Sequence, residues 1–556
     1  MQDQLKEQLE PKTIRDQKIM TYERTVIHQT DSFEIVSVVW NSNSISKNHS
    51  HGYSQCMVHV ESGVFENTTD LGFTTEKKIY EAGQVFNTPL GAKHEMRCLS
   101  AYGKTLHVYT PKIVENVEPN TFKVSVSNEL KSDLLLSKAT DIESVKKILD
   151  QIVKQSITTD SPYFMNQLFS GVLPQMLMAE EVIAKTKTTL ATREASPALS
   201  VIESEVIDSL GQIIGWPKGQ RDGVSVPGGS AANFMALHCA RQKMFPEIKK
   251  TGLTGQKFKI FVSCEAHYSF KKACMALGFG TESLISVDAD IHGRMCSKSL
   301  EKNIIEQKNN GGIPLIICAT AGTTVLGTFD PILELSEICK KYSLWLHVDA
   351  AWGGPALFSK KLSQQILGIE KANSVTFDAH KLFGASLTCS FFLTQHPNIL
   401  LEANDVSGAD YLFHENSETN NYEIDRGKLS WQCGRKADAL SFWTIWKSAG
   451  TDGLGQFVDR LLDVRDETLN WIQTQPRLQL VADPVYLNLC LRVVPPANKD
   501  IKDWSRAVRE ILKEKNQAMV NYSTNEQGHF LRLILAHPFL QFKDVKQILE
   551  WALDAE

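Results

Sequence analysis

Short apolar runs that alternate with helical stretches constrain the fold of this 556-residue chain most strongly. The runs FKIFVSC, PLIICAT, LWLHVDA and SVTFDAH fall within residues 258–380. Runs of this length, separated by segments with apolar residues at helical spacing, predict βαβ units and a buried, largely parallel sheet. The chain is too long for one hydrophobic core, so we expect about three or four structural units.

The two flanks of this α/β region have different patterns. Residues 22–110 contain SFEIVSVVW, QCMVHVESGVF and KTLHVYT, which are rich in β-branched and aromatic residues and are separated by Gly, Asn and Ser. This pattern predicts a small all-β barrel or sandwich. Residues 112–135 are mixed and polar, as a connector would be. Residues 440–556 mix helical and strand patterns, which predicts a small α+β C-terminal domain.

Composition argues against two classes of partner. The formal net charge of −5 offers no basic field for nucleic acid. No apolar run is long enough to cross a bilayer, and the polar start MQDQLKEQLEPKTIRDQK lacks the apolar segment of a signal peptide. We therefore expect a cytoplasmic protein without a membrane partner. The 11 cysteines are scattered without CxxC pairs, which indicates reduced thiols.

Histidines in the β region indicate a metal site. His49 and His51 are two residues apart, so on a strand both side chains project from one face. His94, in GQVFNTPLGAKHEMRC, offers a third imidazole. Three neutral imidazoles would leave open positions on a metal ion for a substrate and O2. A histidine pair alone also occurs in inert barrels and in sensor domains.

The spacing around these histidines resembles the two sequence motifs of cupins. Cys56 stands where cupins commonly carry a glutamate, and Asn43 replaces the leading glycine of the first motif. Together with TLHVYTP, the histidines and Cys56 resemble cysteine dioxygenase more narrowly. That resemblance implies Fe(II) held by His49, His51 and His94 without a carboxylate.

The resemblance to cysteine dioxygenase covers about residues 20–112 and implies roles for further side chains. These are the thioether-forming pair Cys56 and Tyr109, the hydrogen-bonding partners of that tyrosine, His107 and Thr105, and the substrate-binding residues Tyr22 and Arg24. Arg24 would bind the carboxylate of L-cysteine by a bidentate, charge-assisted contact, and O2 would be the second substrate. The thioether would tune the iron without binding it.

A second site is indicated downstream. Lys381 in SVTFDAHKLFG follows a buried strand, where a lysine can form a Schiff base with an aldehyde cofactor. Asp349 in HVDAAWGG follows the neighbouring strand and could keep a pyridine nitrogen protonated. Gly228, Gly229 and Ser230 precede a helical stretch, and the N–H groups of a helix N-terminus suit a phosphate. Together these features favour a pyridoxal phosphate site.

The order of these motifs, with YFMNQLFSG upstream and QCGRKADAL downstream, resembles the group II pyridoxal-phosphate decarboxylases over about residues 140–556. Within that group the resemblance is strongest to the glutamate and cysteine sulfinate decarboxylases. It implies fold type I, with an aspartate aminotransferase-like large domain, and a homodimer that builds its pocket across two subunits. The further cofactor-site residues that it implies are His267, stacked on the ring, and Thr323, Thr324, Ala351 and His380.

The same resemblance implies a substrate pocket. Asn166 and Gln167 would contact the acidic side chain, and Arg532 in FLRLILA would hold the α-carboxylate perpendicular to the cofactor ring. Met165 stands where a phenylalanine is usual, which leaves the choice of substrate open. Tyr422 lies in the loop that normally supplies a proton donor, but the loop is one residue longer here and Tyr422 is out of register.

The two sites fit consecutive reactions. Cysteine dioxygenase makes cysteine sulfinate, and one branch of the decarboxylases converts cysteine sulfinate to hypotaurine, so we expect a bifunctional enzyme. The expected segments are a cysteine dioxygenase-like cupin (1–115), a linker (116–138), a helical segment (139–200), the cofactor-binding large domain (201–438) and the small C-terminal domain (439–556). One alternative is a glutamate or aspartate decarboxylase governed by a sensory cupin. Another is an inactive binding scaffold.

Overall fold

The computed structural model describes residues 22–30, 33–46, 48–50, 54–89, 92–110, 121–122, 124–136, 139–406, 408–413, 425–496 and 500–555. The chain folds into two compact units. The first, here called the β-rich unit, comprises residues 1–119 and 172–177. The second comprises residues 120–171 and 178–556, and because it contains the segment whose sequence resembles the decarboxylases it is here called the decarboxylase unit.

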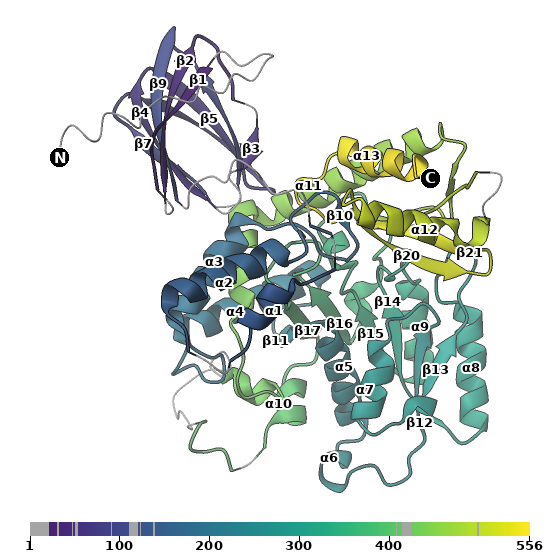
Figure 1. Ribbon diagram of the computed structural model, residues 1–556. Coiled ribbons are helices and arrows are strands. Elements are labelled where there is room, and N and C mark those ends of the chain that lie inside the picture. The colour runs from purple at the N-terminus through teal and green to yellow at the C-terminus, as the bar shows by residue number, and fades with distance from the viewer. Residues whose placement is uncertain are drawn as a thin grey trace. The chain divides into compact units, whose positions relative to one another are not determined.

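The β-rich unit contains two antiparallel sheets, with the orders β1-β2-β9-β4-β7 and β3-β8-β5-β6 (Figure 1). Its strands are β1 (Tyr22–Gln29), β2 (Glu34–Asn41), β3 (His49–Ser50), β4 (Gln55–Ser62), β5 (Val64–Asp70), β6 (Thr75–Glu81), β7 (Val85–Thr88), β8 (Lys93–Cys98) and β9 (Tyr102–Thr110). Trp40 and Val58 of the first sheet share a core with Phe65 and Met96 of the second. The predicted all-β region is confirmed, its sheets are antiparallel, and its assignment to the cupin type stays a prediction.

The decarboxylase unit is built around a seven-stranded sheet with the order β11-β17-β16-β15-β14-β12-β13. The strands are β11 (Asp222–Pro227), β12 (Phe258–Ser263), β13 (Leu284–Val287), β14 (Ile313–Thr320), β15 (Trp345–Asp349), β16 (Ser374–Asp378) and β17 (Cys389–Thr394). Neighbours from β16 to β13 pair in parallel, whereas β17 is antiparallel to both β16 and β11. The predicted, largely parallel sheet is therefore confirmed.

Helices flank this sheet and precede it in the chain (Figure 1). They are α1 (Asn128–Asp133), α2 (Ile142–Gln155), α3 (Pro174–Thr186), α4 (Pro197–Ile214), α5 (Gly229–Met244), α6 (Ile248–Thr251), α7 (Ser269–Ala276), α8 (Ser297–Asn309), α9 (Ile332–Tyr342) and α10 (Ile399–Asn404). Helix α4 begins with a proline and ends at Gly215, whose φ of 100° lets the chain turn out of the helix.

A smaller sheet with the order β10-β20-β21-β19-β18 completes the unit. Its elements and the helices beside it are β18 (Leu478–Leu480), β19 (Asn488–Val493), β20 (Met519–Asn525), β21 (Gly528–Ile534), α11 (Ala439–Ile472), α12 (Ile501–Glu514) and α13 (Phe542–Leu553). The fifth strand, β10 (Phe164–Met165), precedes the large sheet in the chain and pairs in parallel with β20. The C-terminal α+β domain therefore takes one strand from a segment that the sequence pattern placed with the upstream helices.

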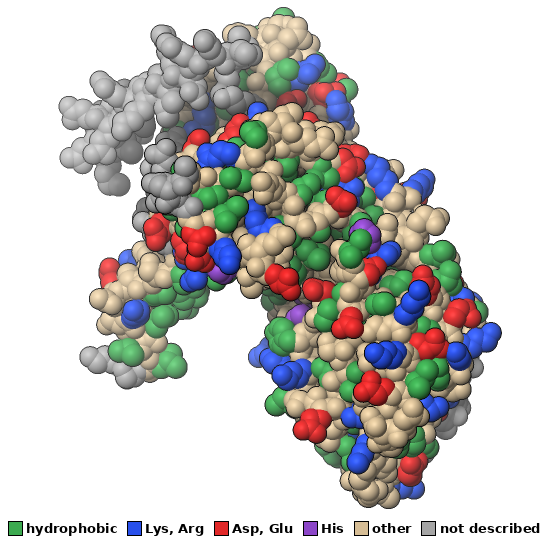
Figure 2. Space-filling view, turned by 90° about the vertical axis from the view of Figure 1, so that its right-hand side faces the viewer, with side chains coloured by type: hydrophobic (Ala, Val, Ile, Leu, Met, Phe, Trp, Pro, Cys, Tyr) green, Lys and Arg blue, Asp and Glu red, His purple; other side chains and the backbone are tan. Residues whose placement is uncertain are grey.

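The molecular surface mixes charges of both signs. On the face shown in Figure 2, Lys and Arg side chains are interspersed with Asp and Glu side chains. This mixture agrees with the small net charge of −5. Within the described ranges, the helices include none that is both long enough and apolar enough to cross a membrane.

Candidate functional sites

Two carboxylates and a lysine lie at the carboxyl edge of the large sheet. Parallel strands β15 and β16 end at Asp349 and Asp378, and Lys381 follows three residues later. The Lys381 Nζ atom lies 3.2 Å from Asp378 Oδ2. His380 is anchored by its Nδ1 atom, 2.9 Å from the carbonyl oxygen of Cys389. Ligands of open α/β sheets bind at this edge, so Lys381 is suitably placed for a cofactor.

Asp349 is buried and held by a network of neutral hydrogen bonds. Its Oδ2 atom accepts a bond of 2.7 Å from the Asn233 amide, and its Oδ1 atom accepts one of 3.1 Å from the N–H of Ala351. Thr376 donates to the Asn233 Oδ1 atom at 2.8 Å, and His347 Nε2 lies 3.0 Å from the same oxygen. Burial lowers the pKa of His347 to about 3, so this histidine is neutral and donates to Asn233.

His267 belongs to the same site. Burial lowers the pKa of its imidazole, and the nearby Lys381 acts in the same direction, whereas Asp349 and Asp378 oppose the shift. The ring is further held by its Nδ1 atom, which accepts a bond of 3.3 Å from the N–H of Ser269. A neutral, flat and fixed imidazole suits the predicted stacking on a cofactor ring.

The predicted phosphate cradle lies at the start of α5. Gly228 has a φ of 95°, a left-handed conformation that favours glycine. A Cβ atom on Gly229 would lie 2.7 Å from Asp378 Oδ2, so only glycine fits there. Ser230 is exposed. The first turn of this 16-residue helix can therefore be approached closely by an anion.

The predicted pocket threonines have structural contacts. The Thr323 hydroxyl lies 2.9 Å from that of Thr328 and accepts a 3.1 Å bond from its N–H, which closes the turn after β14. The carbonyl oxygen of Thr324 accepts a bond of 2.9 Å from Arg532 Nη1. Thr324 thus meets the substrate-binding candidates through its backbone.

Arg532 and Asn166 are brought together across the small sheet. Arg532 Nη2 donates to the Asn166 carbonyl oxygen at 3.0 Å. Among the described residues, the buried atoms Arg532 Nε and Asn166 Oδ1 have no hydrogen-bond partner. Buried polar atoms without partners are costly unless a ligand or water satisfies them. Gln167 is exposed, and Tyr422 lies outside the described residues.

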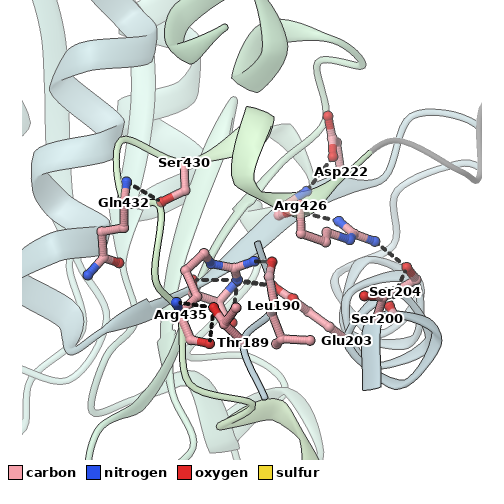
Figure 3. A network of polar contacts seen from close by, with 12 residues as sticks. Thr189, Leu190, Ser200, Glu203, Ser204, Asp222, Arg426, Ser430, Gln432 and Arg435 are labelled. Carbon is pink, nitrogen blue, oxygen red and sulfur yellow. Dashed lines mark hydrogen bonds and ion pairs between the residues drawn. The ribbon is translucent and has the colours of Figure 1, made fainter. Parts of the chain in front are cut away.

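A buried ion pair supports the segment that follows the loop of Tyr422. Arg435, from the QCGRKADAL motif, pairs with Glu203 of α4 (Figure 3). It also donates to the Ser225 hydroxyl at 2.7 Å. The pKa of Glu203 is lowered because Arg435 and Arg426 outweigh the effect of its complete burial. Sequence reasoning cited the motif but missed this partner. An acidic residue on the buried face of α4 was the only signal.

In the β-rich unit, the predicted residues occupy directly paired positions of neighbouring strands. His49 of β3 pairs with His94 of β8, and their ring centroids are 4.8 Å apart. His94 Nδ1 lies 2.9 Å from Asn67 Oδ1, so a metal ion would be bound by its Nε2 atom. His51 lies outside the described residues. The remaining described side chains supply no group of three or more metal-binding residues.

A buried polar row lies on β9. Tyr109 pairs with Cys56 of β4, and its hydroxyl lies 3.2 Å from His107 Nδ1. His107 Nε2 lies 2.9 Å from the Thr105 hydroxyl, which accepts a bond from Trp40 Nε1. Burial raises the pKa of the Cys56 thiol to about 12, so the unmodified thiol is protonated. The structure thus brings Cys56, Tyr109 and His107 together.

The substrate-binding candidates of the β-rich unit lie on β1. The Tyr22 ring packs on Trp40, with ring centroids 4.6 Å apart. Arg24 forms an ion pair of 3.2 Å with Glu34, whose side chain is buried. Burial of Tyr109 raises the pKa of its hydroxyl, and the positive charge of Arg24 lowers that pKa. The Arg24 guanidinium is therefore close enough to act on the buried row. The sequence did not indicate Glu34 as the partner of Arg24.

The large parallel sheet, with its lysine and aspartate at the carboxyl edge and its glycine cradle, defines a pyridoxal phosphate enzyme of fold type I. The family model of the pyridoxal-dependent decarboxylase conserved domain matches residues 127–494. The chain therefore belongs to the pyridoxal-dependent decarboxylase family. The match begins beyond the strands of the β-rich unit.

Individual relatives agree with this assignment. Cysteine sulfinic acid decarboxylase of Mus musculus is 36% identical over 453 residues, which cover 79% of this chain and 90% of the relative. The acidic amino acid decarboxylase GADL1 of Bos taurus is 35% identical over 411 residues, which cover 72% of this chain and 78% of the relative. The crystal structure of mouse CSAD superposes with a TM-score of 0.74 and 32% identity, covering 78% of this chain and 92% of that structure.

Proposed function

We propose that the decarboxylase unit removes the α-carboxylate of cysteine sulfinate. The observation that carries this proposal is the joint placement of Lys381 and Asp349 at one sheet edge, in a chain whose relatives include a cysteine sulfinic acid decarboxylase. The residues fit pyridoxal phosphate, because Gly229 keeps the head of α5 accessible and Asp349 is a fixed buried carboxylate. When bound, pyridoxal phosphate supplies an electron sink for the electrons left by the departing carboxylate.

Each protein group then has a distinct task. Lys381 would hold the cofactor covalently through its Nζ atom. Asp349 would hold a proton at the pyridine nitrogen, and Asn233 keeps the carboxylate oriented for this. Arg532 would orient the substrate α-carboxylate for its departure. His267, neutral and rigid, would cover one face of the ring and exclude water.

We further propose that the β-rich unit is an iron-dependent cysteine dioxygenase. His49 and His94 would supply two of the three imidazoles, and His51 the third. The cluster of Cys56, His107 and Tyr109, buried as a unit, supports this reading more strongly than a sensor domain. When bound, Fe(II) would supply the activation of O2 for the oxidation of the thiol, and Arg24 would position the substrate carboxylate.

The two proposals combine into one function, the conversion of L-cysteine to hypotaurine through cysteine sulfinate. The alternative is a glutamate or aspartate decarboxylase with a regulatory β-rich unit. The similarity to GADL1, an acidic amino acid decarboxylase, supports this alternative.

The deciding experiment supplies the full chain, loaded with Fe(II) and pyridoxal phosphate, with L-cysteine and O2. Mass spectrometry of the products should identify hypotaurine. Adding cysteine sulfinate instead of cysteine tests the decarboxylase unit alone, and glutamate and aspartate serve as competing substrates. Hypotaurine from the sulfinate but not from cysteine would reject the dioxygenase proposal. Release of CO2 only from glutamate or aspartate would establish the alternative.

The family resemblance also implies a homodimer, and we propose one. Helix α2 is amphipathic, yet it has no buried residue. Ile142, Leu149 and Val153 are each more than half exposed. Exposed apolar rows of this kind mark a protein interface. A second copy of the chain is the partner that would complete a pocket shared by two subunits.

A further inference from the structure

Thr88 carries a buried hydroxyl that the fold does not use. It is the last residue of β7, and only 3% of it is exposed. Its Oγ1 atom has no hydrogen-bond partner among the described residues. Within the described strands of the β-rich unit, it is the one buried side-chain oxygen or nitrogen of this kind. An unpartnered buried hydroxyl costs free energy, so it indicates a place for the hydrogen-bonding group of a ligand.

The hydroxyl lies at one end of a buried row that crosses four strands. Glu34 of β2 pairs with Tyr109 of β9, which pairs with Cys56 of β4. Cys56 pairs in turn with Thr88 of β7. Directly paired residues of antiparallel strands project from the same face of the sheet. All four side chains are buried, so the row faces the core that the two sheets share.

The other polar groups of this row have partners. At the opposite end, Glu34 forms its ion pair with Arg24 at 3.2 Å. The Tyr109 hydroxyl lies 3.2 Å from His107 Nδ1, and Cys56 Sγ lies 3.8 Å from the same nitrogen. The threonine hydroxyl is therefore the one polar group of the row that the described part of the chain leaves unused.

The row lies at the same end of the β-rich unit as a predicted metal-binding histidine. Strand β7 ends at Thr88, and the next strand, β8, begins at Lys93 and carries His94 as its second residue. Because the end of β7 is linked directly to the start of β8, Thr88 and His94 lie at the same end of the unit, although in different sheets. His94 is also buried and pairs with His49. A ligand bound near these imidazoles is therefore suitably placed to contact the threonine hydroxyl.

We propose that the Thr88 hydroxyl donates a hydrogen bond to the sulfur of a small amino-acid thiol bound in the β-rich unit. Arg24, at the opposite end of the row, suits the carboxylate of such a ligand, so the sulfur would be directed toward Thr88. A thiol that binds a metal ion does so as the thiolate, and a hydroxyl donates more strongly to a charged acceptor than to a neutral one. The inference rests on the proposed cysteine dioxygenase function and deepens it, because it names a residue that recognises the reacting end of the substrate.

The test uses the full chain freed of pyridoxal phosphate, so that L-cysteine cannot react with that cofactor. After excess iron is removed, calorimetry under argon measures the binding of L-cysteine to the Fe(II)-loaded wild-type chain and to Thr88→Val, which has a methyl group in place of the hydroxyl. The affinity should fall about tenfold in the variant, as expected for the loss of one hydrogen bond to a charged acceptor. Thr88→Ser keeps a hydroxyl and should restore most of the affinity.

Thermal unfolding of the same chains without iron and L-cysteine separates this role from a structural one. Thr88→Val should melt at the wild-type temperature or above it, because it removes an unpartnered polar group. Thr105→Val is the matched control and should melt at a lower temperature, since the Thr105 hydroxyl contacts both Trp40 and His107.

Two results would overturn the inference: equal affinities of the wild-type chain and Thr88→Val for L-cysteine, or a lower melting temperature of Thr88→Val. If the wild-type chain binds no L-cysteine, the proposed function of the β-rich unit is wrong and the inference fails with it.

Discussion

The two units build their polar sites in different ways. In the β-rich unit, His49 faces His94 and Cys56 faces Tyr109 on adjacent antiparallel strands, so the site follows from strand register. In the decarboxylase unit, the site lies where parallel strands end, and its groups come from distant parts of the chain. The first arrangement depends on the register of two pairs of neighbouring strands, whereas the second depends on the whole sheet.

The two units also differ in the partners that stabilise their buried charged side chains. The decarboxylase unit buries a full ion pair, Arg435 with Glu203, and keeps Asp349 among neutral donors. The β-rich unit pairs its buried Glu34 with the partly exposed Arg24. We therefore expect the two units to respond independently to substitutions, and the following predictions test that independence.

The largest effect is expected for Lys381→Ala. The variant should lose all CO2 release and the visible absorbance of the bound cofactor, because the reactive amine is gone. Production of sulfinate from cysteine should be unchanged, since Lys381 lies in the other unit. A well-folded variant that loses both activities would contradict independence. Product analysis and absorbance spectra on the same sample provide both readouts.

The next effect concerns the dimer. Leu149→Glu together with Val153→Glu should convert a dimer into monomers. Each such side chain contributes roughly 1.5–3 kcal/mol when fully buried, and both subunits carry the changes. Sedimentation velocity measures the shift, and decarboxylation should fall with it while cysteine oxidation persists. Substitution of the exposed Lys147 of the same helix by Gln is the matched control. A fully active wild-type monomer would reject the proposed dimer.

Breaking the buried ion pair should destabilise one unit alone. Arg435→Ala leaves Glu203 charged and buried, which costs about 3–5 kcal/mol. The urea midpoint for unfolding of the decarboxylase unit should fall accordingly, while the midpoint of the β-rich unit should not change. Replacing both partners, by Arg435→Met with Glu203→Leu, should restore much of the loss. Lys146→Ala, which breaks an exposed pair with Glu143, is the control and should leave the midpoint unchanged.

Arg24→Gln should weaken cysteine oxidation in the β-rich unit. Loss of a charge-assisted contact costs about 1.5–3 kcal/mol, or roughly ten- to a hundredfold in affinity. Hypotaurine formation from cysteine should fall, and decarboxylation of added cysteine sulfinate should not. Because Arg24 also pairs with Glu34, a thermal melt must accompany the kinetics. Unchanged cysteine oxidation would make the β-rich unit a sensor.

The smallest effect at neutral pH concerns the Cys56 thiol, whose influence on stability is confined to alkaline pH. Its folded-state pKa is raised from 9.0 to about 12, so its contribution to stability is complete below pH 9 and is lost as the pH rises toward 12. Over that range the wild-type chain should lose at most about 1.4 kcal/mol of unfolding free energy per pH unit through this thiol. Cys56→Ser should not show this loss. Wild-type chain that has formed the proposed Cys56–Tyr109 thioether should resemble the variant, and its joined peptides should be lighter by two hydrogens.

Short-range patterns predicted much of this molecule. The period of two placed Thr105, His107 and Tyr109 on one face, and the apolar runs predicted the parallel sheet. The support of Asp349 was not predictable in this way. Asn233 comes from a helix that begins more than a hundred residues earlier, and its contact depends on the assembled sheet. The strand β10 was missed because two residues carry no periodicity.

The pairing of β10 with β20 also limits how early this part of the chain can fold during synthesis. Asn521 of β20 donates to the carbonyl oxygen of Asn166, 355 positions earlier in the chain. At roughly 5–20 residues per second of synthesis, the segment around Asn166 waits about 20–70 seconds before its partner emerges. The end of the decarboxylase unit for which we propose substrate binding is therefore assembled last, after the large sheet has left the ribosome.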